Sequence, residues 1–90
     1  MNKGEIVKQI AVITNVSETQ TNKFLQAFID IVENELKSGG NVSITGFGSF
    51  QVKYRAARTG RNMKTGEAVS IDAVNIPAFK PGKRFRQAVL

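Results

Sequence analysis

The stretch RAARTGRNMKTGEAVS, residues 55–70, carries four basic side chains and almost no large apolar ones. Its middle, residues 62–66, has the composition of a turn. If its two sides pair, each is roughly eight residues long and reaches about 25 Å. Such a ribbon cannot bury enough apolar surface to pack on a core, so we expect it to project into solvent. A projecting ribbon rich in arginine is suited to binding a phosphate backbone. The alternative interpretation of this stretch is a disordered basic loop without a specific role.

The positive charge of the chain is concentrated in its C-terminal half, which contains this stretch. Residues 51–90 hold nine Lys or Arg against two acids, a net of +7, and residues 1–50 hold four against five, a net of −1. A basic half beside a nearly neutral half predicts binding of a polyanion. The alternative is a charge excess that serves solubility alone.

Several functional classes are excluded by residues that the chain lacks. It has no Cys and no His, so disulfides, Cys/His zinc sites and His-dependent catalysis are absent. No glycine-rich loop leads into Lys-Ser or Lys-Thr, and no pair of acids is marked by its spacing. We therefore expect no enzymatic activity, metal, cofactor or small-molecule substrate. The early apolar run, Ile10–Ile13, is too short for a signal peptide or a membrane span, so we expect a soluble protein.

The first forty residues predict two helices. Asn2 with Glu5, and Ser17 with Gln20, form capping boxes, and Ser38-Gly39-Gly40 ends the second helix. The apolar face of this second helix is wider than a short helix could cover, which favours a dimer over a single wide core face beneath a sheet. The residues at helical spacing are Ile6, Val7, Ile10, Ala11, Ile13 and Thr14, then Phe24, Leu25, Phe28, Ile29, Ile31, Val32 and Leu36.

After Gly40 the apolar period changes from 3.6 to 2, which predicts strands. A tight turn is expected at residues 46–48, and Tyr54 is expected on the buried face of the strand that follows. Pro77 and Pro81 are expected to close the sheet region before a short last helix. The fold class is α+β in one domain, residues 1–90, with a helical part (1–40) and then a three-stranded antiparallel sheet, a protruding β-ribbon arm (about 55–72) and the last helix (41–90). The alternating residues are Val42, Ile44, Phe50, Val52 and Tyr54, and a returning strand holds Val69, Ile71, Val74 and Ile76.

Four motifs resemble the HU/integration-host-factor family of bacterial histone-like DNA-binding proteins, and the similarity covers essentially the whole chain. They are Gly46-Phe47-Gly48-Ser49-Phe50, Tyr54–Asn62, Lys64–Glu67 and Pro77–Lys83. The resemblance implies an intertwined dimer with a helical base, a saddle of sheets and two β-arms in the minor groove of duplex DNA. It also implies a place in the nucleoid of a bacterial cytoplasm.

The resemblance assigns DNA contacts to particular side chains of this chain. Asn62 matches the arm-tip residue beside the wedge that unstacks base pairs in the family, and the wedge position, usually Pro, is Met63 here. Lys3 matches a basic residue at the flank of the family's DNA-binding surface, and the alternative is that it is a solvated lysine at the end of a helix. Arg84 and Arg86 are assigned to DNA binding from their charge alone. The dimer core is assigned Phe28, Phe47, Phe50 and Phe79. The matching arm and saddle cations are Lys53, Arg55, Arg58, Arg61, Lys64, Lys80 and Lys83.

The expected function is architectural, with largely sequence-non-specific bending and compaction of double-stranded DNA by a homodimer that favours bent, nicked or junction DNA. The alternative is an integration-host-factor-like subunit that bends chosen sites. Against it, Thr45 stands where one branch of that family has an Arg, and no extension follows Leu90. A basic RNA-binding protein is the other alternative, but stacking on single strands needs exposed aromatic rings, and the one candidate, Tyr54, is expected on the buried face. RNA is therefore expected only as a secondary partner, since its phosphates would attract the same arms.

Overall fold

The computed structural model describes residues 1–90, which divide into two compact units, residues 1–34 and 35–90. Helices α1 (Lys3–Thr14) and α2 (Glu18–Lys37) begin at the predicted caps. The Asn2 side chain accepts a hydrogen bond from the Glu5 main-chain N–H at 3.0 Å, and Ser17 Oγ accepts one from Gln20 N–H at 3.1 Å. Both caps satisfy main-chain donors that a helix start leaves unpaired, so the predicted starts are confirmed.

The helical part of the chain buries few apolar side chains. Val7, Ala11 and Val32 are buried, together with Thr21, whose hydroxyl donates to the Ser17 carbonyl at 2.8 Å. Ile13, one of the residues at helical spacing, is 80% exposed in the single chain. At 3.6 residues per turn it lies about 140° around the helix from the line joining Val7 and Ala11.

Three antiparallel strands form the sheet of the second unit, in the order β1 (Val42–Ile44), β2 (Gly48–Arg55) and β5 (Val74–Pro81). The β1–β2 turn is closed by a 3.0 Å hydrogen bond from Phe47 N–H to the Ile44 carbonyl. Gly48 is required here, since it has a φ of +156° and a Cβ would stand 2.5 Å from the Lys80 carbonyl oxygen. The predicted tight turn is confirmed.

Pro77 does not close the sheet region, as the sequence suggested, but lies within β5 opposite Val52. β5 is an edge strand of the sheet. An edge strand tolerates proline where the missing N–H would have faced outward, away from the ladder.

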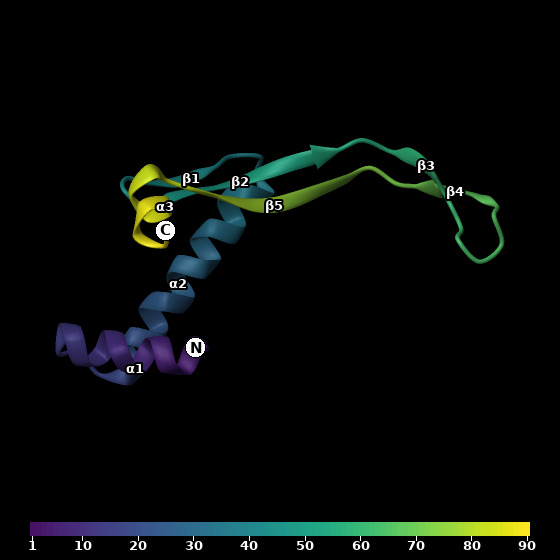
Figure 1. Ribbon diagram of the computed structural model, residues 1–90. Helices are drawn as coiled ribbons and strands as arrows, with labels where there is room; N and C mark the ends of the chain where they lie inside the picture. Colours follow the sequence, from purple (N-terminus) through teal and green to yellow (C-terminus); the bar gives the residue numbers. More distant parts are fainter. The chain divides into compact units, whose positions relative to one another are not determined.

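The arm is a separate two-stranded ribbon of β3 (Arg58–Arg61) and β4 (Ala68–Ile71), which pair with each other and with no other strand (Figure 1). Each side has four paired residues, fewer than the eight expected. The returning segment, expected as one strand, is two strands, because residues 72–73 separate β4 from β5. The expectation of a ribbon that does not pack on a core is confirmed, since every residue from 53 to 70 except the half-buried Gly60 is exposed.

A cluster of phenylalanine rings forms the centre of the second unit. The Phe47 ring centroid lies 5.1 Å from that of Phe79 and 4.9 Å from that of Phe85, and Phe50 lies 5.0 Å from Phe79. Phe85 belongs to helix α3 (Lys83–Ala88). Gly82, which directly precedes α3, donates a 2.8 Å hydrogen bond from its N–H to the Phe47 carbonyl. The ring contacts and this hydrogen bond join the last helix to the β1–β2 turn. The architecture is α+β, as predicted.

Candidate nucleic-acid interface

The register of the sheet separates an apolar face from a basic one. Residues paired across an antiparallel ladder point to the same face, and neighbours along a strand alternate. Phe50 pairs with Phe79 and with Val42, so these side chains share one face. The opposite face carries three exposed cations and two hydroxyls: Lys53, Arg55, Lys80, Ser43 and Ser49.

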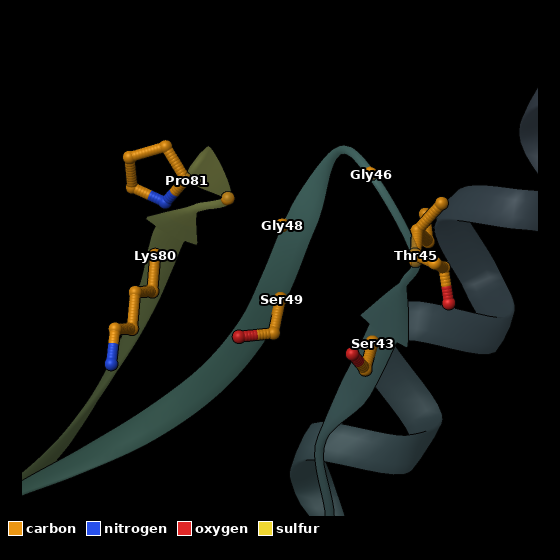
Figure 2. Close-up of a pocket in the computed structure, with 9 residues that line it drawn as sticks. Ser43, Thr45, Gly46, Gly48, Ser49, Lys80 and Pro81 are labelled. Atoms are coloured by element: carbon orange, nitrogen blue, oxygen red, sulfur yellow. The ribbon is translucent and has the colours of Figure 1, made fainter. Parts of the chain in front are cut away.

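The hydroxyls of this basic face border a shallow depression of about 290 Å³ beside the β1–β2 turn. Figure 2 shows Ser43, Ser49 and Lys80 around it, contributed by all three strands. Ser43 and Ser49 are directly paired, and Ser49 is in turn paired with Lys80. Two hydroxyls and an ammonium on neighbouring strands are hydrogen-bonding groups suited to a phosphate oxygen. Neither serine was among the contacts predicted from the sequence, although the turn at residues 46–48 implies their pairing.

The arm carries cations on both of its faces. Arg58 is paired with Ile71 and Arg61 with Ala68, and the odd spacing of the two arginines places them on opposite faces of the ribbon. Both are exposed, as is Lys64 beyond them. Residues 53–64 contain five cations and no acid. The structure therefore places Arg58, Arg61 and Lys64 on the arm, whereas Lys53 and Arg55 lie on β2 of the sheet.

The arm tip is an ordered turn rather than a loose loop. The Asn62 side-chain oxygen accepts hydrogen bonds from Lys64 N–H at 2.9 Å and Thr65 N–H at 3.4 Å. The Asn62 main chain donates to the Glu67 carbonyl and accepts from Gly66 N–H, each at 2.7 Å. Gly66 takes a φ of +74°, which closes the predicted turn. Met63 stands at this turn with 96% of its surface exposed.

The remaining predicted contacts lie on the helices. Lys83, Arg84 and Arg86 are exposed on α3, and the Arg84 guanidinium lies 3.8 Å from where a Cβ at Gly46 would stand, beside the β1–β2 turn. Lys3 is the first residue of α1 and donates a 2.6 Å hydrogen bond to the Gln26 side chain of α2. Contact of Lys3 with DNA stays a prediction.

Two aromatic residues differ from their expected surroundings. Tyr54 shares a face with Phe50, as its alternation suggested, yet it is 71% exposed instead of buried. The reason is that its cross-strand partner is Asn75, beyond the ring cluster, so no large side chain covers it. Phe85 was not expected in the cluster. It is brought there by the tertiary position of α3.

No group of three or more Asp or Glu side chains lies close enough together to hold a metal ion. None of the helices has the length and apolar character that crossing a membrane requires.

Comparison with known proteins places the chain among bacterial DNA-binding proteins. Residues 1–90 match the family described as bacterial DNA-binding protein. The chain is 46% identical over 89 residues to the DNA-binding protein HU-alpha of Vibrio proteolyticus, covering 99% of each. It is 44% identical to the DNA-binding protein HU of Xylella fastidiosa, covering 99% of this chain and 95% of that one.

A solved structure gives the same result. The structure described as an Anabaena HU–DNA cocrystal superposes with a TM-score of 0.92 at 43% identity, covering 99% of this chain and 97% of that chain. The family match, the level of identity and the shared fold extend over the whole chain. The chain therefore belongs to the HU family of bacterial DNA-binding proteins.

Proposed function

We propose that this chain is an architectural protein that binds double-stranded DNA with little sequence preference and bends it by laying its arms in the minor groove. The observation that carries the proposal is the isolated β3–β4 ribbon, with cations on both faces and an exposed apolar residue, Met63, at its tip. A ribbon charged on both faces can neutralise phosphates on both walls of a groove.

The basic face of the sheet extends the same electrostatic surface. Lys53, Arg55 and Lys80 would contact backbone phosphates, and the hydroxyls of Ser43 and Ser49 would add hydrogen bonds to phosphate oxygens. Contacts of this kind position a protein on the duplex without reading its sequence. They support sequence-tolerant binding, and the names of the HU relatives and the Anabaena HU–DNA cocrystal support DNA as the partner.

The arm tip supplies the bend. Minor-groove architectural proteins, HU and integration host factor among them, insert apolar side chains, including Met, between base steps and kink the duplex by about 20–90°. Met63 has the apolar character and the exposure for this role. Its flexible side chain loses more rotamer entropy on insertion than proline would, which reduces the net gain from each kink.

The functional unit that we propose is a homodimer in the bacterial nucleoid. The single chain leaves Phe24 64%, Ile31 62%, Phe47 38% and Phe79 37% exposed, and its only buried apolar residues are Val7, Ala11 and Val32. A core this thin does not stabilise a folded monomer. A second copy covers these side chains and supplies the second arm.

The test measures binding and bending separately. Gel shifts on linear, nicked and four-way-junction DNA give affinities, and energy transfer between the ends of a short labelled duplex gives the bend. We expect binding to all three DNA forms, with nicked and junction DNA favoured because their stacking is already broken. Met63→Ala should weaken bending of intact duplex on the order of tenfold and binding to nicked DNA by less than about threefold, since unstacking costs a few kcal/mol per step.

Competition experiments distinguish the alternatives. If random duplex fails to compete for one labelled site, the protein is a site-specific bender of the integration-host-factor kind. If single-stranded RNA competes better than any duplex, the exposed Tyr54 becomes the candidate stacking residue and the architectural function is wrong. An unchanged bend in Met63→Ala would mean that the arms hold DNA by charge alone.

A further inference from the structure

Apart from Leu90 at the end of the chain, Met63 is the most exposed of the large apolar side chains. It is 96% exposed, and the Asn62 side chain fastens the main chain on its C-terminal side through Lys64 N–H and Thr65 N–H. The thioether therefore stands at a defined point of the arm with solvent on nearly all sides. A peroxide in solution can reach its sulfur without any opening of the fold.

The composition concentrates oxidation on methionine. The chain has no Cys and no Trp, and its two methionines are Met1 and Met63. Exposed methionine reacts with a peroxide when a sulfur lone pair attacks one peroxide oxygen and the O–O bond breaks. That oxygen stays on the sulfur as a sulfoxide, the other leaves as water after taking up a proton, and the sulfur is oxidised by two electrons while the peroxide is reduced. Methionine sulfoxide reductases reverse the change with electrons from thiols.

We propose that Met63 is a reversible oxidation site through which peroxide controls the bending of DNA by this protein. The inference rests on the proposed function of Met63 as a wedge. A thioether is apolar enough to enter a stack of base pairs, whereas the sulfoxide carries a strong hydrogen-bond acceptor that loses its water there. Oxidation leaves the arm cations unchanged, so the oxidised protein stays on DNA but ceases to kink it.

The position of Met1 gives the control for this chemistry. Met1 is 79% exposed and precedes α1, in the other compact unit, and its sulfur lies 4.0 Å from the Gln9 side-chain nitrogen. Peroxide should oxidise both methionines, and only the sulfoxide at Met63 should alter bending. A time course that separates the two sulfoxides by peptide mass spectrometry therefore assigns the effect.

The experiment treats the full-length protein with hydrogen peroxide, removes the peroxide, and measures bending of an intact duplex and binding to nicked DNA. We expect bending to fall about tenfold in step with the Met63 sulfoxide fraction, and binding to nicked DNA to change by less than about threefold. A sulfoxide reductase with a thiol should restore the bend. Met63→Leu lacks the oxidisable sulfur, so its ratio of treated to untreated bending should stay near one.

The outcomes separate this inference from the proposed function. If the untreated protein does not bend duplex DNA, the proposed function fails and the inference with it. If the untreated protein bends DNA and complete oxidation of Met63 leaves the bend unchanged, only the inference is overturned. Loss of bending that follows the Met1 sulfoxide, or that the reductase does not reverse, also overturns it.

Discussion

At the arm tip, the Asn62 side-chain oxygen is used inside the protein. It accepts from two main-chain N–H groups of the turn, so any contact of this side chain with DNA is left to its amide nitrogen. Asn62 was predicted as a DNA contact from its place beside the wedge. The structure gives it a positioning part as well, because it orders the turn that presents Met63.

Replacing Asn62 by Ala should loosen the tip without unfolding the protein. The loss of the side-chain acceptor removes about 1 kcal/mol of local stabilisation per hydrogen bond. We expect faster amide hydrogen exchange at Lys64 and Thr65 in the free protein and weaker bending of intact duplex, whereas Asn62→Asp, which keeps the acceptor, should retain slow exchange. Unchanged exchange in Asn62→Ala would show that the turn does not depend on this side chain.

Among the strands, the arm matches the prediction in its exposure to solvent, although its paired segments are shorter than the sequence suggested. β3 and β4 pair only with each other, and their side chains remain in solvent, so the ribbon is held by its own ladder and by the turn at its tip. Two-stranded ribbons of this kind are marginally stable alone. Residues 56–57 and 72–73 separate this short ladder from the longer β2–β5 ladder. The two ladders are therefore separate hydrogen-bonded units.

The arm cations should act through the phosphates and not through the bases. Each phosphate neutralised contributes a slope of about −0.9 to log K against log salt concentration, so a contact present in both subunits contributes about −1.8. Arg58→Ala or Arg61→Ala should flatten the slope by about this amount and weaken binding to all duplexes alike. Fluorescence titration at several salt concentrations measures it.

Two controls accompany this titration. Arg58→Lys keeps the charge and should keep the slope. Lys23→Ala removes a cation of α2 that is outside the proposed contacts, and it should leave the slope unchanged. A loss of affinity confined to one DNA sequence would instead mean that the arginines read bases.

At the scale of the whole molecule, one chain does not contain enough buried surface for a stable protein. No large side chain is fully buried, and Phe24, Ile31 and Phe47 remain partly or mainly in solvent. Folded domains are stable by only about 5–15 kcal/mol, so the burial missing from one chain is decisive. The helical face and the ring cluster therefore support obligate dimerisation as a proposal.

We expect sedimentation at micromolar concentrations to give twice the chain mass of 9.8 kDa. Phe47→Ala removes a ring that contacts both Phe79 and Phe85 and that the proposed dimer would bury, and loss of a buried ring costs about 3–5 kcal/mol. In a dimer the loss occurs twice and should abolish folding, as circular dichroism would report. Leu90→Ala removes a side chain that is wholly exposed and should have no effect. A well-folded monomer at high concentration would contradict the dimer.

The sequence alone determined the features that depend on neighbouring residues. Both helix starts follow from Asn2 and Ser17, whose side chains bond to N–H groups three residues on, and the turns at residues 46–48 and 62–66 follow from glycines at positive φ and from Asn62. The ribbon was predictable because a segment so poor in apolar side chains has no core to join. These local rules need no knowledge of distant contacts.

Only the tertiary structure decided which side chains meet across the sheet. The pairing of Ser49 with Lys80 joins residues far apart in the chain, and it places both on the face with Lys53 and Arg55. The exposure of Tyr54 and the entry of Phe85 into the ring cluster also depend on where β5 and α3 lie. Alternation along a strand shows that its two faces differ. What covers each face is determined by non-local pairing and packing, and a local pattern contains no information about those contacts.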